Sequence, residues 1–187
     1  MARWGVSCQP DGMKFRTLIL AAAFLAVGVV ASAIDLSTHA YFKHLIGKWK
    51  AAGDLTNSEG KVLKVTEDWT GKVDAEGGFY IEGSRTIDGD TQPFKWSITH
   101  NPAIDTYEAV LTGGQGSQEV RFEGSLSEVN LTMVLKAITG SGESSITVED
   151  SFVDEAKDTF QSKVKFIGEQ GQTNLEGTIV HKRDKEP

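Results

Sequence analysis

Cysteine is nearly absent from this chain of 187 residues, because its one cysteine, Cys8, lies close to the N-terminus. From residue 9 onward the chain therefore offers no disulfide, no thiolate nucleophile and no cysteine-based metal site. The motifs H-E-x-x-H, G-x-S-x-G, G-x-x-x-x-G-K-[ST] and G-x-G-x-x-G are also missing. Their absence removes the common signatures of zinc proteases, serine hydrolases, P-loop NTPases and dinucleotide-binding folds. The sequence assigns no catalytic residue and implies no metal.

Positive charge is in short supply. The chain has 19 basic residues against 26 acidic ones, a formal net charge of −7, and no stretch concentrates the lysines and arginines into a stripe. Such a surface repels phosphate backbones, so nucleic acid is not an expected partner. The acidic excess is typical of a solvated surface.

Long apolar runs are absent except for one, Leu18 to Val30. Lys14 and Arg16 precede this run, and the small residues of "ASA" at 31–33 follow it. A basic start, a short apolar core and small residues at the end are the pattern of a secretory signal peptide. We expect cleavage after Ala33 and export to the periplasm or the medium, without stable membrane insertion. Residues 34–187 are then enough for one domain.

Helical spacing occurs only between Asp35 and Ile46, where the apolar residues suit one short helix. Asp35 or Ser37 can cap its start, and Gly47 can end it. After Gly47 the pattern changes to alternation of apolar and polar residues.

Short turns rich in Gly, Asn and Asp divide the rest of the chain into runs of a strand's length. Links this short favour antiparallel pairing of consecutive strands, and a meander with one apolar face buries that face most simply by closing into a barrel. The prediction is an all-β, closed, up-and-down barrel of about ten strands, with a two-sheet β-sandwich as the alternative. The expected strands are 47–56, 61–73, 78–88, 93–101, 106–112, 117–126, 130–138, 144–153, 158–167 and 173–183.

Gly47 and Trp49, at the start of the first expected strand, resemble the G-x-W motif of the lipocalin and calycin superfamily. Lys182 and Arg183, near the end of the last expected strand, are similar to the basic residue that lies over that tryptophan in lipocalins. The resemblance implies that Trp49 plugs one end of a barrel, with Gly47 allowing tight packing under the indole.

The order of "HLIGKW", "GGFYIEG" at 77–83 and "ITHNPAIDTYEA" at 98–109 resembles a bacterial family of uncharacterised lipocalin-like proteins. Members share the G-x-W opening, a G-G-F strand start and a "YDP…Y" turn. Here His100 and Asn101 replace the aromatic and acidic residues before Pro102. The resemblance implies the fold and no site.

Polar residues interrupt the apolar face of several strands, where an unpaired group would be costly to bury. Alternation places Glu67, Arg85, His100 and Asp150 there, together with Ser162 and His181. Strand ends such as His100 and His181 are expected at a rim. With Trp96 as a wall, Glu67, Arg85, His100 and Asp150 form the predicted binding site for a small apolar or amphipathic ligand. Arg85 would serve a ligand carboxylate unless Glu67 neutralises it, and a buried ion-pair network or an outward β-bulge is the structural alternative.

Other functions stay open at this point. Glu67, Arg85, Asp150 and His100 could serve an enzyme, or the lumen could be filled in a structural or interaction barrel. A minor alternative concerns His181, since the nitrobindin-type haem barrels use a late histidine as axial ligand. That resemblance rests on the barrel, the early G-x-W and this histidine, and otherwise no cofactor is expected.

Overall fold

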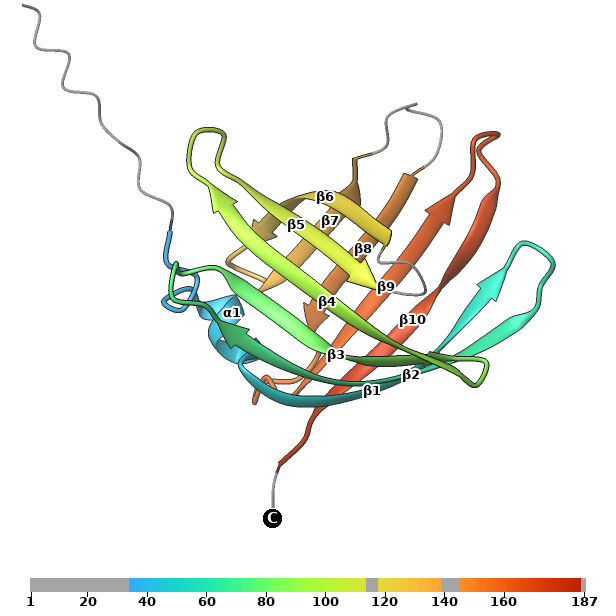
Figure 1. Cartoon of the computed structure of the whole chain (residues 1–187), viewed down its shortest axis with the longest axis horizontal. Coiled ribbons are helices and arrows are strands. Elements are labelled where there is room, and N and C mark those ends of the chain that lie inside the picture. The colour runs from blue at the N-terminus through green and yellow to red at the C-terminus, as the bar shows by residue number, and fades with distance from the viewer. Residues whose placement is uncertain (1–33, 114–117, 139–144, 186–187) are drawn as a thin grey trace, which may run out of the picture. The chain divides into compact units, whose positions relative to one another are not determined.

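The computed structural model describes residues 34–113, 118–138 and 145–185, which form one short helix and a closed barrel of antiparallel strands (Figure 1). The predicted signal peptide lies outside the described residues. The elements in chain order are α1 (Ala40–Leu45), β1 (Gly47–Asn57), β2 (Val62–Val73), β3 (Phe79–Ile87), β4 (Asp90–Asn101), β5 (Thr106–Gly113), β6 (Gln118–Ser127), β7 (Thr132–Ala137), β8 (Ser145–Phe152), β9 (Thr159–Ile167) and β10 (Thr173–Arg183).

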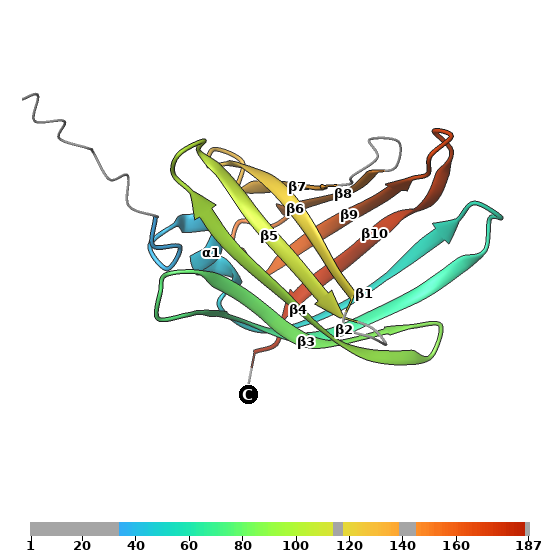
Figure 2. The ribbon, with the colours of Figure 1, turned by 45° about the horizontal axis from the view of Figure 1, so that its top comes forward.

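Each strand pairs with its neighbours in sequence, and β1 pairs with β10 to close the ring (Figure 2). The closing pair runs in register from Trp49 opposite Arg183 to Asn57 opposite Leu175. Among the ten described strands, closure leaves no open sheet edge for another chain to pair with. The predicted up-and-down barrel is confirmed, and the sandwich alternative is wrong.

Most strand ends agree with the alternation within a few residues, and the largest difference is at β4. This strand begins at Asp90, three residues before its expected start at position 93. Asp88 and Gly89 both have positive φ, 50° and 89°, which makes them the two central residues of a tight hairpin turn. The "DG" pair is therefore the whole connection, and Asp90 already pairs with Ile87.

The helix is shorter than predicted, and its cap is neither Asp35 nor Ser37. Asp35 accepts from the Ser37 backbone N–H at 2.9 Å in a turn before the helix. The N-cap is His39, whose Nδ1 accepts from the Tyr41 N–H at 3.3 Å. An imidazole with a free lone pair thus takes the place of the usual oxygen acceptor.

One face of α1 covers the end of the barrel. Tyr41, Phe42 and Leu45 are buried, and the Phe42 ring lies 5.2 Å from that of Phe79. Gly71 of β2 allows this approach, because a Cβ there would come within 2.2 Å of the Leu45 carbonyl oxygen. The helix and its glycine partner close one end of the barrel.

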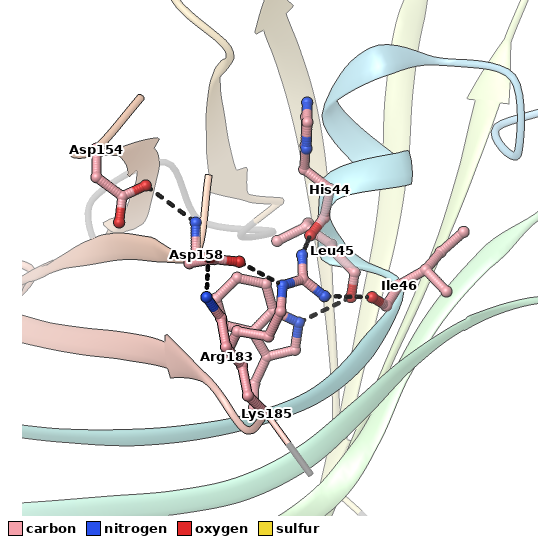
Figure 3. Close-up of polar contacts among 8 residues, drawn as sticks. His44, Leu45, Ile46, Asp154, Asp158, Arg183 and Lys185 are labelled. Atoms are coloured by element: carbon pink, nitrogen blue, oxygen red, sulfur yellow. Dashed lines mark hydrogen bonds and ion pairs between the residues drawn. The ribbon is translucent and has the colours of Figure 1, made fainter. Parts of the chain in front are cut away.

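Arg183, at the end of β10, links the helix end to the first strand (Figure 3). Its Nη1 donates to the Ile46 carbonyl at 2.8 Å, its Nη2 to the His44 carbonyl at 2.5 Å, and its Nε to Asp158 at 2.9 Å. Carbonyls at a helix end have no partner within the helix, so these bonds satisfy them. One arginine therefore joins α1 to the closing strand pair.

Trp49 lies under this arginine as the resemblance implied. The guanidinium carbon of Arg183 is 4.5 Å from the Trp49 ring centroid, and the indole N–H donates to the Leu45 carbonyl at 3.0 Å. The role of Gly47 differs from the expectation. It has φ 114°, and a Cβ there would meet Arg183 Nη1 at 3.1 Å, so Gly47 makes room for the guanidinium rather than for the indole.

The interior contains the apolar face that alternation predicted, in two clusters. The larger surrounds Trp49, Trp69, Phe122 and Leu135, and the smaller joins Leu55, Val65, Ala51 and Ile179, with Leu63 packed against it. On the outer face of the sheet, Lys64 and Lys163 are exposed, and Thr132 is half-buried. Within the described part of the chain, no helix has the length and apolarity needed to cross a membrane.

Replacing Trp49 by alanine tests the closed end. The indole is fully buried, so its removal should lower the free energy of unfolding by about 3–5 kcal/mol in urea titrations. Val180→Ala, at an exposed position of β10, is the matched control and should stay within about 0.5 kcal/mol of the parent. Equal losses in both variants would contradict the plug.

Candidate functional site in the barrel lumen

The barrel encloses a cavity of about 220 Å³. Its wall is mostly apolar and aromatic, and five strands, β2, β3, β8, β9 and β10, contribute polar side chains to it. The lining residues used below are Glu67, Trp69, Arg85, Phe94, Trp96, Leu111, Val120, Val148, Asp150, Phe160, Ser162 and His181. An apolar cavity with a few polar groups is the usual form of a small-molecule site.

The first strand lets polar groups from its two neighbours meet. Ala51 of β1 pairs with His181 of β10 on one side and with Glu67 of β2 on the other. Because the alanine side chain is a single methyl group, the longer side chains approach each other across it. His181 Nδ1 lies 3.9 Å from Glu67 Oε2.

Glu67 and Arg85 form an ion pair on neighbouring strands, as the sequence suggested. Arg85 Nε donates to Glu67 Oε1 at 2.5 Å, and the two residues are cross-strand partners. The Arg85 guanidinium also lies 4.8 Å from the Phe94 ring centroid, a cation–π arrangement. The Glu67 side chain is 3% exposed, so removing its partner would leave a buried charge unpaired.

A chain of hydrogen bonds joins four further side chains. Trp69 Nε1 donates to His181 Nδ1 at 3.2 Å, His181 Nε2 lies 3.0 Å from Ser162 Oγ, and Ser162 Oγ donates to Asp150 Oδ1 at 2.5 Å. An indole N–H can only donate, so Nδ1 must accept and the neutral ring carries its hydrogen on Nε2. Nε2 therefore donates to Ser162, whose hydroxyl hydrogen is left for Asp150. Every hydrogen in the chain points toward Asp150.

His181 is held neutral inside the barrel. Burial lowers its pKa to about 3, and the nearby Arg85 charge acts in the same direction. The imidazole stacks on Phe160 with the ring centroids 4.2 Å apart and the planes at 4°. The 3.9 Å approach to Glu67 is consequently neither an ion pair nor a hydrogen bond.

Asp150 ends the chain as an acid that keeps its proton unusually well. Burial is the largest cause and raises its pKa to about 7, although the Ser162 hydrogen bond opposes the rise. The Glu67 and Glu149 carboxylates raise it further. Near neutral pH this carboxyl group is therefore divided between its two protonation states.

Four of the five predicted site residues line the cavity. They are Glu67, Arg85, Trp96 and Asp150. His100 does not. It is buried near the helix-covered end, with Nε2 3.0 Å from Asp105 Oδ1 and its ring against Tyr107. His181, expected at a rim, is 5% exposed and inside the lumen.

The histidine does not fit the axial-ligand role considered from the sequence. Both ring nitrogens already have partners, Trp69 and Ser162, and the flat contact with Phe160 covers one face of the ring. Coordination of haem iron would need a free ring nitrogen facing a macrocycle. Within the described residues no group of three His, Cys, Asp or Glu is placed to hold a metal ion.

The serine, histidine and aspartate do not form a nucleophile and its base. In a hydrolase triad the histidine accepts the serine proton. Here His181 donates to Ser162, and the serine hydrogen goes to Asp150, so the order of the groups and the direction of the bonds are both different. This chain of hydrogen bonds orients Asp150 and does not activate Ser162.

A second hollow of about 280 Å³ adjoins the lumen. Five residues line both volumes: Arg85, Ile87, Phe94, Leu111 and Val120. The shared residues place this hollow directly beside the lumen, next to Arg85.

No family model and no curated protein sequence matches this chain. Among solved structures, the chain is similar to the S-type phycobiliprotein lyase CPES from Guillardia theta, with TM-score 0.58, 13% identity, and 79% of this chain and 92% of the other covered. The redesigned β-barrel b11L5F_LGL has TM-score 0.40 at 15% identity, covering 79% and 98% of the two chains. The EF1p2_mFAP2b protein, bound to DFHBI, has TM-score 0.39 at 14% identity, covering 76% and 95%. The likeness to the lyase concerns the fold, which is the closed antiparallel barrel described above.

Asp150→Asn tests the pH behaviour of the buried groups. The raised pKa of Asp150 takes stability away as pH rises from about 4 to about 7, whereas the lowered pKa of His181 takes it away as pH falls from 6.5 toward about 3. In the parent these two slopes cancel between about pH 4 and pH 6.5. The variant keeps only the histidine slope. Between about pH 4 and pH 6.5 its free energy of unfolding should therefore fall more steeply with decreasing pH than the parent's, and the difference in slope should correspond to about one bound proton. Near pH 8 its free energy of unfolding should exceed the parent's.

Urea unfolding at several pH values between about 5 and 8 measures these slopes. His181→Gln is the opposing control, because it keeps only the Asp150 slope and should lose stability as pH rises. Parallel profiles for the parent and both variants would contradict the assigned pKa directions.

Proposed function

We propose that this protein binds a small apolar or amphipathic molecule in the lumen of the barrel. The observation that carries the proposal is the cavity of about 220 Å³, which combines apolar walls with Asp150 held in place by a hydrogen-bond chain. A barrel with a purely structural lumen has no need of a hollow interior, since cores pack to crystal-like density. The likeness to the lyase shows the fold alone, so the proposal rests on the lumen.

The geometry favours binding over catalysis. The Arg85–Glu67 pair and the chain from Trp69 to Asp150 join these polar groups to one another across the lumen. Such pairing holds them rigid, which lowers the entropic cost of receiving a ligand. No nucleophile is activated in this arrangement.

Filling the lumen tests the proposal. A neutral apolar dye such as N-phenyl-1-naphthylamine should gain fluorescence on entering the cavity and quench Trp69 or Trp96, which line it. Val148→Trp places an indole in the same space and should abolish this binding. Val180→Trp, at an exposed position of β10, is the matched control and should bind as the parent does.

Thermal unfolding of each variant establishes that it is folded. Lumen binding would be rejected if the folded parent caused no increase in dye fluorescence. It would also be rejected if a folded Val148→Trp variant bound the dye as tightly as the parent.

Export is part of the proposal, and it rests on the residues before Ile34. We propose that the binding protein acts in the periplasm or the medium after removal of the leader. N-terminal sequencing of the protein recovered outside the cytoplasm should begin at Ile34. Recovery of a chain that retains "ASA" at 31–33 would contradict this cleavage site.

A further inference from the structure

The charges inside the lumen do not balance in the way a carboxylate-binding site needs. Among the residues that line the cavity, only Arg85 and His181 can carry positive charge. Glu67 neutralises Arg85 at 2.5 Å, and His181 is neutral with both nitrogens engaged. The lining therefore offers no uncompensated cation to an anionic head group.

Asp150 is the ionisable group that has no cationic partner among the residues that line the cavity. Its Oδ1 accepts from Ser162, and none of the cationic side chains that line the cavity pairs with it. The donor chain behind it, from Trp69 through His181 and Ser162, ends at this carboxyl group. Its remaining lone pairs are acceptors in an apolar lumen, which favour a ligand that brings hydrogen-bond donors or positive charge.

The aromatic walls add to the same preference. Trp96 and Phe122 lie with ring centroids 5.0 Å apart, and Trp69 and Phe160 lie 6.0 Å apart. The negative faces of aromatic rings attract ammonium groups. Phe94 already shows this mode with the Arg85 guanidinium.

We infer that the lumen recognises a cationic amphiphile, a molecule with a protonated amine and an apolar tail, through the Asp150 carboxylate. The amine bonds to Asp150, and the tail extends past Phe94, Leu111 and Val120 into the adjoining hollow. The inference rests on the proposed function and gives it a head-group chemistry. It replaces the ligand carboxylate that Arg85 suggested in the sequence.

Affinity for the amine then depends on pH. Asp150 has a pKa of about 7. The ionisable groups around it are Glu67 on β2, Arg85 on β3, Glu149 on β8, His181 on β10 and Tyr41 on α1, whose own pKa burial raises well above its usual value. An alkylamine stays protonated throughout the neutral range, so only the ionisation of Asp150 changes its binding. Affinity should be about tenfold weaker near pH 6 than near pH 8.

Three probes of equal tail length separate the alternatives: octylamine, octan-1-ol and octanoate. Displacement of N-phenyl-1-naphthylamine from the parent protein near pH 8 should rank octylamine first, about tenfold or more tighter than octanol, with octanoate weakest. Asp150→Asn keeps an acceptor for Ser162 but no charge. It should bring octylamine down to the affinity of octanol and leave octanol unchanged.

Arg85→Gln is the second arm. A carboxylate site would lose octanoate on this substitution, whereas an amine site keeps or tightens octylamine because Glu67 is no longer neutralised. The pH dependence of the parent tests the inference even if a variant does not fold.

The outcomes separate the two proposals. Octanol binding with no preference for octylamine, or octanoate binding as tight as octylamine, would overturn the head-group inference and leave lumen binding intact. An amine preference that survives Asp150→Asn would overturn it as well. A parent protein that binds neither the dye nor any of the three probes would overturn both.

Discussion

The hydrogen bond from the Trp69 indole to His181 Nδ1 determines the character of the lumen. Because the indole N–H can only donate, the bond selects one tautomer of the imidazole, and that tautomer can only donate at Nε2. Ser162 accepts this hydrogen and passes its own to Asp150. Reversing the first bond would reverse the chain and turn Ser162 into a donor toward the histidine. The hydrogen-bond chain therefore ends in an acceptor, the carboxyl group of Asp150.

Small residues of β1 make this interior possible. After the bulky Trp49, the inward positions are Ala51 and Gly53 before Leu55 resumes the apolar face. Ala51 lets side chains from the strands on either side meet across it, and a Cβ on Gly53 would come within 2.2 Å of the Thr178 carbonyl oxygen. β1 therefore closes one end of the barrel with Trp49, whereas its small residues Ala51 and Gly53 leave room in the interior.

Alternation in the sequence predicted nearly all of the sheet, because a period of two residues reports directly which side chains share a face. It also predicted the Glu67–Arg85 pair, since consecutive strands joined by a short turn have few possible registers. Alternation could not predict how far along the barrel axis each inward-facing residue lies. His100 and Asp150 share the inner face by alternation, but His100 lies near the helix-covered end and Asp150 lines the cavity.

The bond between Trp69 and His181 lay beyond the sequence for a related reason. The two residues are 112 positions apart and come together only through the closure of β1 on β10. The local sequence does not specify the register in which these strands pair. A signal was nevertheless present, since a histidine and a serine on the inner face of the last two strands both need partners there. The indole of Trp69, apolar in body with one donor, was the group able to supply one.

The residues at the helix-covered end of the barrel differ in role from those in the cavity. At the helix-covered end, Arg183 satisfies the carbonyls that close α1 and lies over Trp49, which stabilises the closed end. In the cavity, Arg85 and Glu67 neutralise each other, which leaves Asp150, with its raised pKa, as the carboxyl group to which we assign recognition of the ligand. The raised pKa of Asp150 lowers the free energy of unfolding as pH rises toward 7, but a carboxyl group that stays protonated inside the lumen costs less than a fully ionised one would. In the amine site that we propose, Asp150 ionises when the protonated amine binds, and the attraction between the two charges offsets the energy of ionising the carboxyl group.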